Sequence, residues 1–438
     1  MTLDMRKLQQ SADWLAVAVV VSLPWSTSVS VILIVVWLVA TLPTLVVADM
    51  RRELSTAAGG LPVLLWLFAA VGMLWADVPW AERIDGLGGF HRLLAIPLLL
   101  AQFRRSQCGP CACYGFLISA TVLLALSSLL MLLPLRTLDH VPLFGAHTKA
   151  YGVPVKDYIL QSGIFLICAF GLIGAACERW RETRWPTIAA MLCLAAGFLA
   201  NIAFVATSRT TVVVAPVLAI VLGYRYFGWR GVALAGIVAA ALAGAGLTAS
   251  PYLHLRVMHT FTELRNYLNT DEDNSTGLHM EFLKKSAAIV EAAPVIGHGT
   301  GSIAAQFRLA ASGEAGSASA VATVNPHSQI FAVAIELGVV GAAVLLAMWA
   351  AHALLFRGAG LMAWIGTIVV AQNFLSSLVN SHLFDFGQGW LYVFGVGVVG
   401  GTVLRKAAPP GAKPRRRLLC RAIPACWWWR CAGLATCC

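Results

Sequence analysis

The sequence predicts an all-α, polytopic membrane protein with about 12 transmembrane helices and one large helical loop on the extracytoplasmic side. Of its 438 residues, 59% are hydrophobic and only 12% are charged, whereas soluble domains carry roughly a quarter charged residues. Apolar runs of about 20 residues, long enough to cross a bilayer, recur along the chain. The net charge of +11 fits basic loops at one membrane face better than binding to nucleic acid.

The apolar runs place the expected spans in order along the chain. The first run follows Arg6 and Lys7 without a small-residue cleavage site, which predicts a retained span in place of a signal peptide. Lysine and arginine concentrate in alternate loops, so the positive-inside rule puts both termini in the cytoplasm. The expected spans lie near residues 12–24, 27–48, 58–76, 88–102, 112–134, 158–177, 187–206, 211–224, 231–249, 328–355, 360–379 and 389–404.

These spans divide the chain into four parts. Residues 1–249 hold the first nine spans, residues 250–326 form the long extracytoplasmic loop, residues 327–404 hold the last three spans, and residues 405–438 form a basic cytoplasmic tail. The loop is expected to contain short helices of its own, because Ser250-Pro251 is a typical helix start.

Two further loop helices are expected after the one that begins at Ser250-Pro251 and extends to Leu268. A polar turn separates that helix from a second, amphipathic one over Leu278–Ala293. The glycine-rich turn Gly297–Gly301 then leads into a third.

Several cationic side chains gather at the outer ends of the spans. Arg209 lies in a connection too short to be a free loop, so it either snorkels to a lipid headgroup or binds a phosphate, which its planar fork matches. Arg265, on the first loop helix, is either a solvated charge or points back toward the bundle. The remaining candidates for binding an anionic ligand such as a diphosphate are Arg83, Arg92, Tyr151, Lys156 and Lys284. Lys284 and Lys285 would otherwise form a water-facing stripe.

The most informative motif is Asn325-Pro326-His327-Ser328-Gln329, directly before an apolar run. His327 adds nothing to membrane insertion. It either caps the helix locally or acts as a general base, because the pKa of imidazole lies near neutrality. Asn325 is a candidate for substrate binding. Glu336 is an intramembrane carboxylate and hence a functional hypothesis by default, and Asp385, at the last outer turn, could orient a neighbouring group.

The triplet Asp271-Glu272-Asp273 has the form with which many sugar transferases hold a divalent metal. The favoured interpretation is three solvated carboxylates in a turn between two loop helices. Because arginines can neutralise a diphosphate leaving group, neither a metal nor another cofactor is expected.

Together these features resemble the superfamily of O-antigen ligases and polymerases. The resemblance rests on the long late loop, the segments Ala293–Gly301, Asn325–Gln329 and Glu336–Gly341, and the turn Ser208-Arg209-Thr210. It implies a metal-independent, inverting glycosyltransferase that moves O-antigen polysaccharide from undecaprenyl diphosphate to a sugar hydroxyl of lipid A–core. The reaction would take place in the periplasmic leaflet of the bacterial inner membrane.

The resemblance also implies roles for individual residues. The essential histidine of the superfamily corresponds to His327, which would remove the acceptor proton. Its two essential arginines correspond to Arg209 and Arg265, which would stabilise charge on the leaving diphosphate. The sequence departs from the pattern at Ser328, where many members have asparagine. It also departs at His279, near the position where many have an arginine at the start of the second loop helix.

Three alternatives remain open. A polymerase of the same superfamily would use the same donor, but such polymerases tend to carry two substantial outer loops, and here one dominates. A protein O-oligosaccharyltransferase is a further branch. A secondary transporter would place polar residues near the midplane on broken helices and often show internal repeats, and neither is evident in the sequence.

Overall fold

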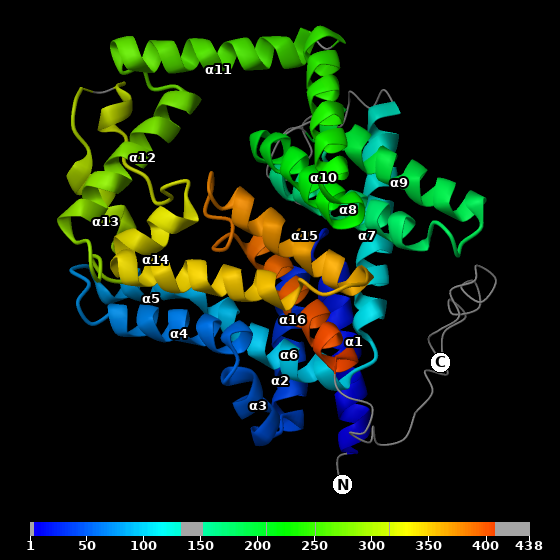
Figure 1. The fold of residues 1–438 in the computed structure, drawn as a ribbon. Helices are drawn as coiled ribbons and strands as arrows, with labels where there is room; N and C mark the ends of the chain where they lie inside the picture. Colours follow the sequence, from blue (N-terminus) through cyan, green and yellow to red (C-terminus); the bar gives the residue numbers. More distant parts are fainter. Residues whose placement is uncertain (1–3, 133–151, 207, 250, 315, 408–438) are drawn as a thin grey trace.

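The computed structural model describes residues 4–132, 152–206, 208–249, 251–314 and 316–407. Throughout these ranges the ordered elements are helices, joined by turns and a single isolated β-bridge between Glu272 and Ser317. The predicted all-α class is therefore confirmed. The helices shown in Figure 1 are α1 (Met5–Ser22), α2 (Thr27–Thr41), α3 (Val47–Leu54), α4 (Ala57–Gly72), α5 (Trp80–His91), α6 (Ala95–Arg105), α7 (Gly109–Leu132), α8 (Tyr158–Arg179), α9 (Trp185–Phe204), α10 (Arg209–Ala249), α11 (Pro251–Thr270), α12 (Ser275–Ala292), α13 (Ile303–Ala310), α14 (Gln329–Leu355), α15 (Leu361–Ser376) and α16 (Phe386–Lys406).

Among the described residues, 8 helices are long and apolar enough to cross a membrane, or 9 if the bent pair α3–α4 forms one span. The class of membrane protein is confirmed, whereas the expected number of about 12 spans stays a prediction. The number of candidate helices differs from the expected number of spans partly because of α10, a single element in which Gly228 has a non-helical backbone (φ 60). A Cβ added at Gly223 would meet the carbonyl of Gly231, although residues eight apart in a straight helix are separated by about 12 Å. The chain therefore turns back at Gly228, between the predicted spans 211–224 and 231–249.

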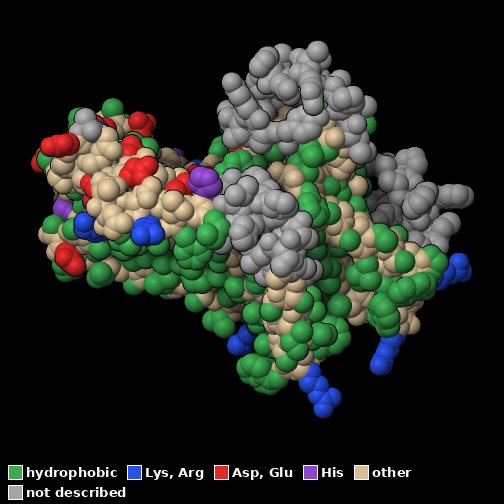
Figure 2. Space-filling view, turned by 90° about the horizontal axis from the view of Figure 1, so that it is seen from above, with side chains coloured by type: hydrophobic (Ala, Val, Ile, Leu, Met, Phe, Trp, Pro, Cys, Tyr) green, Lys and Arg blue, Asp and Glu red, His purple; other side chains and the backbone are tan. Residues whose placement is uncertain are grey.

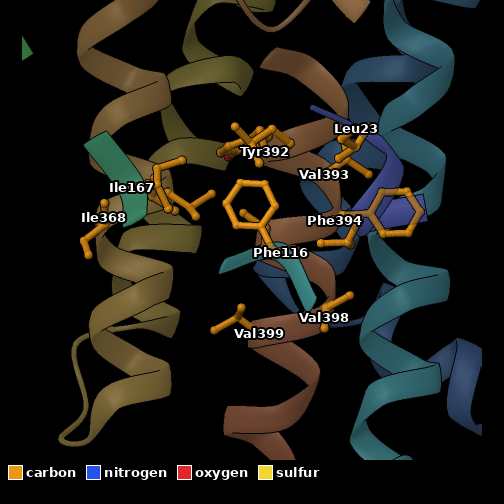
Figure 3. Packing of buried hydrophobic residues seen from close by; sticks show 14 of the residues in the cluster. Leu23, Phe116, Ile167, Ile368, Tyr392, Val393, Phe394, Val398 and Val399 are labelled. Carbon is orange, nitrogen blue, oxygen red and sulfur yellow. The ribbon is translucent and has the colours of Figure 1, made fainter. Parts of the chain in front are cut away.

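The core of the bundle lies among helices from both ends of the chain. Helix α16 packs along α6, and α8 packs along α9. Aromatic rings join distant segments, with Trp37 of α2 against Phe394 of α16 at 5.4 Å and Phe165 of α8 against Phe198 of α9 at 5.0 Å. Figure 3 shows Phe394 among the buried apolar side chains of this core. Burial of these side chains stabilises the arrangement of the helices.

The long loop forms helices α11, α12 and α13, as the sequence predicts, with α12 beginning at Ser275 behind the N-cap Asn274. Figure 1 shows α11 bridging from the end of α10 to α12. Helix α12 packs against α13 and α14 through a small apolar cluster of Phe282, Ile289, Phe307 and Ile335. The loop is thus attached to the bundle through α12.

Helix α14 is broken at Gly338 (φ 64), and residues 294–301 of the loop fill the break. The amide of Val339 donates to the carbonyl of Pro294 at 2.8 Å, and the amide of Gly299 donates to the carbonyl of Glu336 at 2.9 Å. The carboxylate of Glu336 accepts a hydrogen bond from the amide of Gly301 at 2.8 Å. The backbone groups exposed by the break are therefore satisfied by the loop, and Glu336 is held there as well.

Replacing Gly338 with alanine should destabilise the protein, because the added Cβ would overlap the carbonyl oxygen of Val295 and sit at positive φ. Gly316→Ala is the matched control, since Gly316 also has positive φ (95) but a Cβ there meets no atom within 4 Å. We expect Gly316→Ala to cost about 1 kcal/mol and Gly338→Ala at least about 2 kcal/mol. Thermal melting in detergent micelles measures both, and equal losses would contradict a close fit of the loop in the break.

Candidate active site

His327 adopts an unusual backbone conformation immediately before α14. Its φ is 53, a left-handed conformation that is uncommon for residues other than glycine and that costs on the order of 1–3 kcal/mol. The turn is stabilised by Asn325, whose Oδ1 accepts a hydrogen bond from the amide of His327 at 2.9 Å. Among the described residues other than glycine, Lys156 (φ 54) and Asp271 (φ 53) also have positive φ.

Asn325 also joins the His327 turn to the connection between α15 and α16. Its Nδ2 donates to Oδ1 of Asn380 at 3.1 Å, and its Oδ1 accepts from the hydroxyl of Ser381 at 2.8 Å. A second link runs from the amide of Leu383 to Oε1 of Gln329 at 3.0 Å. Asn325, predicted as a substrate-binding residue, is therefore a structural part of the site.

The imidazole of His327 packs against two rings of α12. The ring of His279 lies at 4.3 Å between centroids, edge to face, and Phe282 is stacked nearly parallel at 5.7 Å. His279 is one of the two positions at which the sequence departs from the superfamily pattern. The structure therefore brings His279 into direct contact with His327, the predicted base.

The surroundings of His327 keep its imidazole neutral. Burial lowers the pKa of His327 below its ordinary value of 6.5, and a hydrogen bond with the Asn380 side chain offsets part of the shift. Burial has this effect because a charged imidazolium loses solvation. A neutral imidazole at physiological pH can accept a proton, so the site meets the first requirement for a general base.

A second histidine, which the sequence analysis did not select, lies beside this site. His382 is 1% exposed, and neither ring nitrogen has a hydrogen-bond partner among the described residues. Its Nε2 lies 3.9 Å from Oδ2 of Asp385. Burial, with a smaller effect from His327, lowers the pKa of His382 to about 4. Its place at the end of an apolar helix, like that of His327, is the sequence signal that could have identified it.

Asp385 also has a shifted pKa. Burial raises it to about 6, Arg92 opposes the shift, and Asp157 adds to it. The carboxyl group of Asp385 approaches His382 without a hydrogen bond, so the role of Asp385 in orienting a neighbour stays a prediction. Asp157 precedes α8 and Asp385 precedes α16. The start of each helix therefore lies at the same end of the bundle as His327.

Three of the predicted ligand-binding cations donate to backbone carbonyls. Arg83 donates to Val78 at 2.7 Å and to Met73 at 2.8 Å. Arg92 donates to the carbonyls of Asp385 and Phe384. Lys156 donates to the carbonyl of Leu23 at 2.5 Å, and burial lowers its pKa to about 8. In this structure these side chains connect the helix ends around the site.

The two lysines of α12 differ in a way that corrects the expected water-facing stripe. Lys284 is exposed and pairs with Glu281 at 3.7 Å. Lys285 is 5% exposed and donates to the carbonyls of Ser319 at 2.6 Å and Val321 at 3.0 Å. Lys285 can be buried because these two carbonyls and the carboxylate of Glu281, at 3.9 Å, supply partners for its charge.

Arg265 is exposed on α11 and makes no recorded contact with His327 within the described part of the chain. Glu263 and Tyr267 of the same helix face α12, where they bond to Thr276 at 2.5 Å and Glu281 at 2.7 Å. Arg265 is offset from Glu263 by about 200° around the helix. It therefore points away from α12, and its exposure fits the first of the two predicted alternatives, a solvated charge.

Two other predicted residues fall at the edge of what the structure describes. Arg209 is the first residue of α10, and its side chain lies outside the described residues, as does Tyr151. The turn that carries Arg209 is nevertheless attached to α8. Ser208 is buried and accepts a hydrogen bond from Ser162 at 3.0 Å, and Thr211 bonds to Ser162 at 2.8 Å.

The acidic triplet links two segments of the long loop. The carboxylate of Asp271 accepts hydrogen bonds from the amide and the hydroxyl of Ser319, and Glu272 forms the isolated bridge with Ser317. No group of three or more His, Cys, Asp or Glu side chains suited to a metal ion is found in the described ranges. The contacts of Asp271 support a structural interpretation of the triplet.

Comparison with protein families gives one match. Residues 194–346 match the family model described as O-antigen ligase. The chain therefore carries an O-antigen ligase domain. The resemblance to the O-antigen ligase superfamily is thus confirmed. No curated protein matches the chain. The ligase domain begins in α9 and ends in α14, and it includes the whole long loop, His279, His327 and the break at Gly338.

The buried His382 beside the ligase domain should make stability depend on pH. Its folded pKa of about 4 lies below the ordinary 6.5, so between these values the unfolded chain binds a proton that the folded chain does not. Stability is therefore unaffected by this group above pH 6.5 and falls as pH drops toward about 4. The melting temperature of His382→Gln should fall less with decreasing pH than that of the intact chain. Melting curves recorded from pH 7.5 to 4.5 measure this difference. Parallel curves for the two proteins would contradict a neutral, buried His382.

Proposed function

We propose that this chain is an inverting O-antigen ligase that transfers O-antigen polysaccharide from undecaprenyl diphosphate to a sugar hydroxyl of lipid A–core. The observation that carries the proposal is His327, a half-buried histidine with a lowered pKa in a strained turn, inside an O-antigen ligase domain. Reaction, donor and acceptor follow from the superfamily resemblance, and the burial and strained turn of His327 support its role as the base that such a transfer needs.

The proposed reaction is a single displacement. His327 takes the proton of the acceptor hydroxyl, and the oxygen attacks the anomeric carbon of the donor sugar from the face opposite the diphosphate. The new carbon–oxygen bond forms as the bond to the diphosphate breaks, so undecaprenyl diphosphate leaves and the anomeric configuration inverts. Because diphosphate is already a good leaving group, no pair of carboxylates with glycosidase spacing is required.

Charge on the leaving diphosphate must be stabilised for this reaction. Arg209 and Arg265 are proposed for this role, since arginine matches phosphate oxygens with two parallel hydrogen bonds. His279 is a third proposed contributor, because it stands near the position of an arginine in many members and touches His327. These side chains make a metal unnecessary for the proposed mechanism.

The proposed location is the bacterial inner membrane, with the His327 site facing the periplasm and both termini in the cytoplasm. The distribution of lysine and arginine among the loops supports this orientation. The proposed partners are the undecaprenyl-diphosphate-linked glycan, the lipid A–core acceptor and the surrounding lipids. Lipopolysaccharide biosynthesis is the process in which this chemistry belongs.

A surface-polysaccharide gel tests the proposed reaction. A ligase-deficient host would receive the intact chain or His327→Ala at equal membrane expression, with Met280→Ala, an exposed α12 residue, as the control. We expect the intact chain and the control to restore O-antigen attached to lipid A–core and His327→Ala to abolish it. Restoration by His327→Ala would contradict the base, and long glycan that stays on the lipid carrier would indicate a polymerase.

Variants of His279 test its proposed contribution to the leaving group. His279→Ala should lower the rate of transfer on the order of 10²-fold, as loss of one charge-stabilising donor does elsewhere. His279→Arg should retain activity, because a guanidinium at this position also donates to phosphate oxygens. Initial rates with purified protein measure both variants, and equal losses in His279→Ala and His279→Arg would leave His279 with a packing role alone.

A further inference from the structure

An apolar cavity of about 600 Å³ lies within the bundle, lined by α1, α7, α8, α9, α15 and α16. Its volume falls in the range of about 300–1,000 Å³ that is typical of small-molecule sites. Nearly all lining side chains are hydrophobic, and Figure 3 shows several of them close up. The lining includes Leu23, Phe116, Ile167, Phe394, Val398 and Val399.

One charged side chain, Arg179, stands among the lining residues. It is half-buried at the end of α8, and none of the hydrogen bonds or ion pairs found among the described residues involves its guanidinium. Beside it, Trp180 and Trp185 are 56% and 62% exposed and meet edge to face at 5.4 Å. Exposed tryptophans are typical of the boundary between lipid and water, so the cavity reaches the headgroup region at Arg179.

This end of the cavity lies across the membrane from His327. Helix α8 has 22 residues and is therefore about 33 Å long, close to the thickness of the hydrocarbon layer. Its start, after Asp157, lies near Asp385 and hence at the His327 end of the bundle. Arg179 ends the same helix and so lies at the opposite face. A lipid with its headgroup at Arg179 cannot place that headgroup at His327.

We propose that this cavity binds one anionic phospholipid of the leaflet opposite the His327 site, with an acyl chain between α8 and α16 and its phosphate at Arg179. Charge complementarity favours this occupant, since the guanidinium is the one formal charge on an otherwise apolar lining and arginine binds phosphate oxygens in pairs. Two exposed arginines of the same loop, Arg181 and Arg184, add to the attraction. Basic pockets between transmembrane helices are known to recognise anionic headgroups.

Two independent substitutions can remove the site. Gly171 lines the cavity, and a Cβ there would meet no atom within 4 Å, so Gly171→Leu fills the space without forcing the backbone apart. Arg179→Gln removes the charge. The matched controls are Gly236→Leu, at an exposed glycine that also has open space around it, and Arg51→Gln, at an exposed arginine of α3.

The experiment uses the delipidated full chain in detergent and counts bound phosphatidylglycerol by native mass spectrometry, with phosphatidylcholine and undecaprenyl phosphate as competitors. We expect one phosphatidylglycerol to be retained by the intact chain and both controls. Each of Gly171→Leu and Arg179→Gln should weaken its binding at least about tenfold, the factor for one 1.4 kcal/mol contact. A melting temperature within the range of the controls shows that each variant is folded.

Three results would overturn the proposal. If the intact chain, both variants and both controls retain phosphatidylglycerol equally, the lipid binds elsewhere. If the intact chain retains phosphatidylcholine as well as phosphatidylglycerol, Arg179 does not select the headgroup. Preferential displacement by undecaprenyl phosphate would assign the cavity to the prenyl chain of a donor. Because binding is measured without glycan transfer, failure here is distinguishable from failure of the proposed ligase reaction.

Discussion

The insertion of residues 294–301 into the break of α14 is the constraint on which the site depends. A helix interrupted at Gly338 exposes backbone groups that must find partners in an apolar environment, and the loop supplies them through the backbone of Pro294, His298 and Gly299. The same loop is tied to α12, because His298 bonds to the carbonyl of Ile289 at 2.9 Å. Helix α12 is thereby fixed against α14, which places His279 and Phe282 on the ring of His327.

The charges around the site serve two separate purposes. Arg83, Arg92 and Lys156 are engaged by backbone carbonyls and connect the ends of helices. His327 and His382 are instead held neutral by burial, as their lowered pKa values indicate. A neutral imidazole is what proton removal requires. Stabilisation of the diphosphate is then left to Arg209, Arg265 and His279, which the proposal assigns to that role.

Composition and apolar periodicity were sufficient to predict the all-α membrane class and the helical character of the long loop. They were also sufficient to select His327, because a titratable residue at the mouth of a span has no role in insertion. They could not predict that Lys285 would be buried, since its partners are carbonyls more than 30 residues away along the chain. The contact between His279 and His327 depends on the 294–301 insertion, which no local pattern encodes. The turn at Gly228, in contrast, lies between the two spans that the sequence predicts at 211–224 and 231–249.

His327 is proposed to act as a neutral base in the transfer reaction. The most direct test is the initial rate of glycan transfer by purified protein as a function of pH, with saturating lipid-linked donor. Protonation of the base should produce an acidic limb whose midpoint lies below the ordinary imidazole value of 6.5, because burial lowers the pKa of His327. A midpoint above 6.5, or a rate that does not fall on the acidic side, would show that His327 is not the neutral base of this reaction.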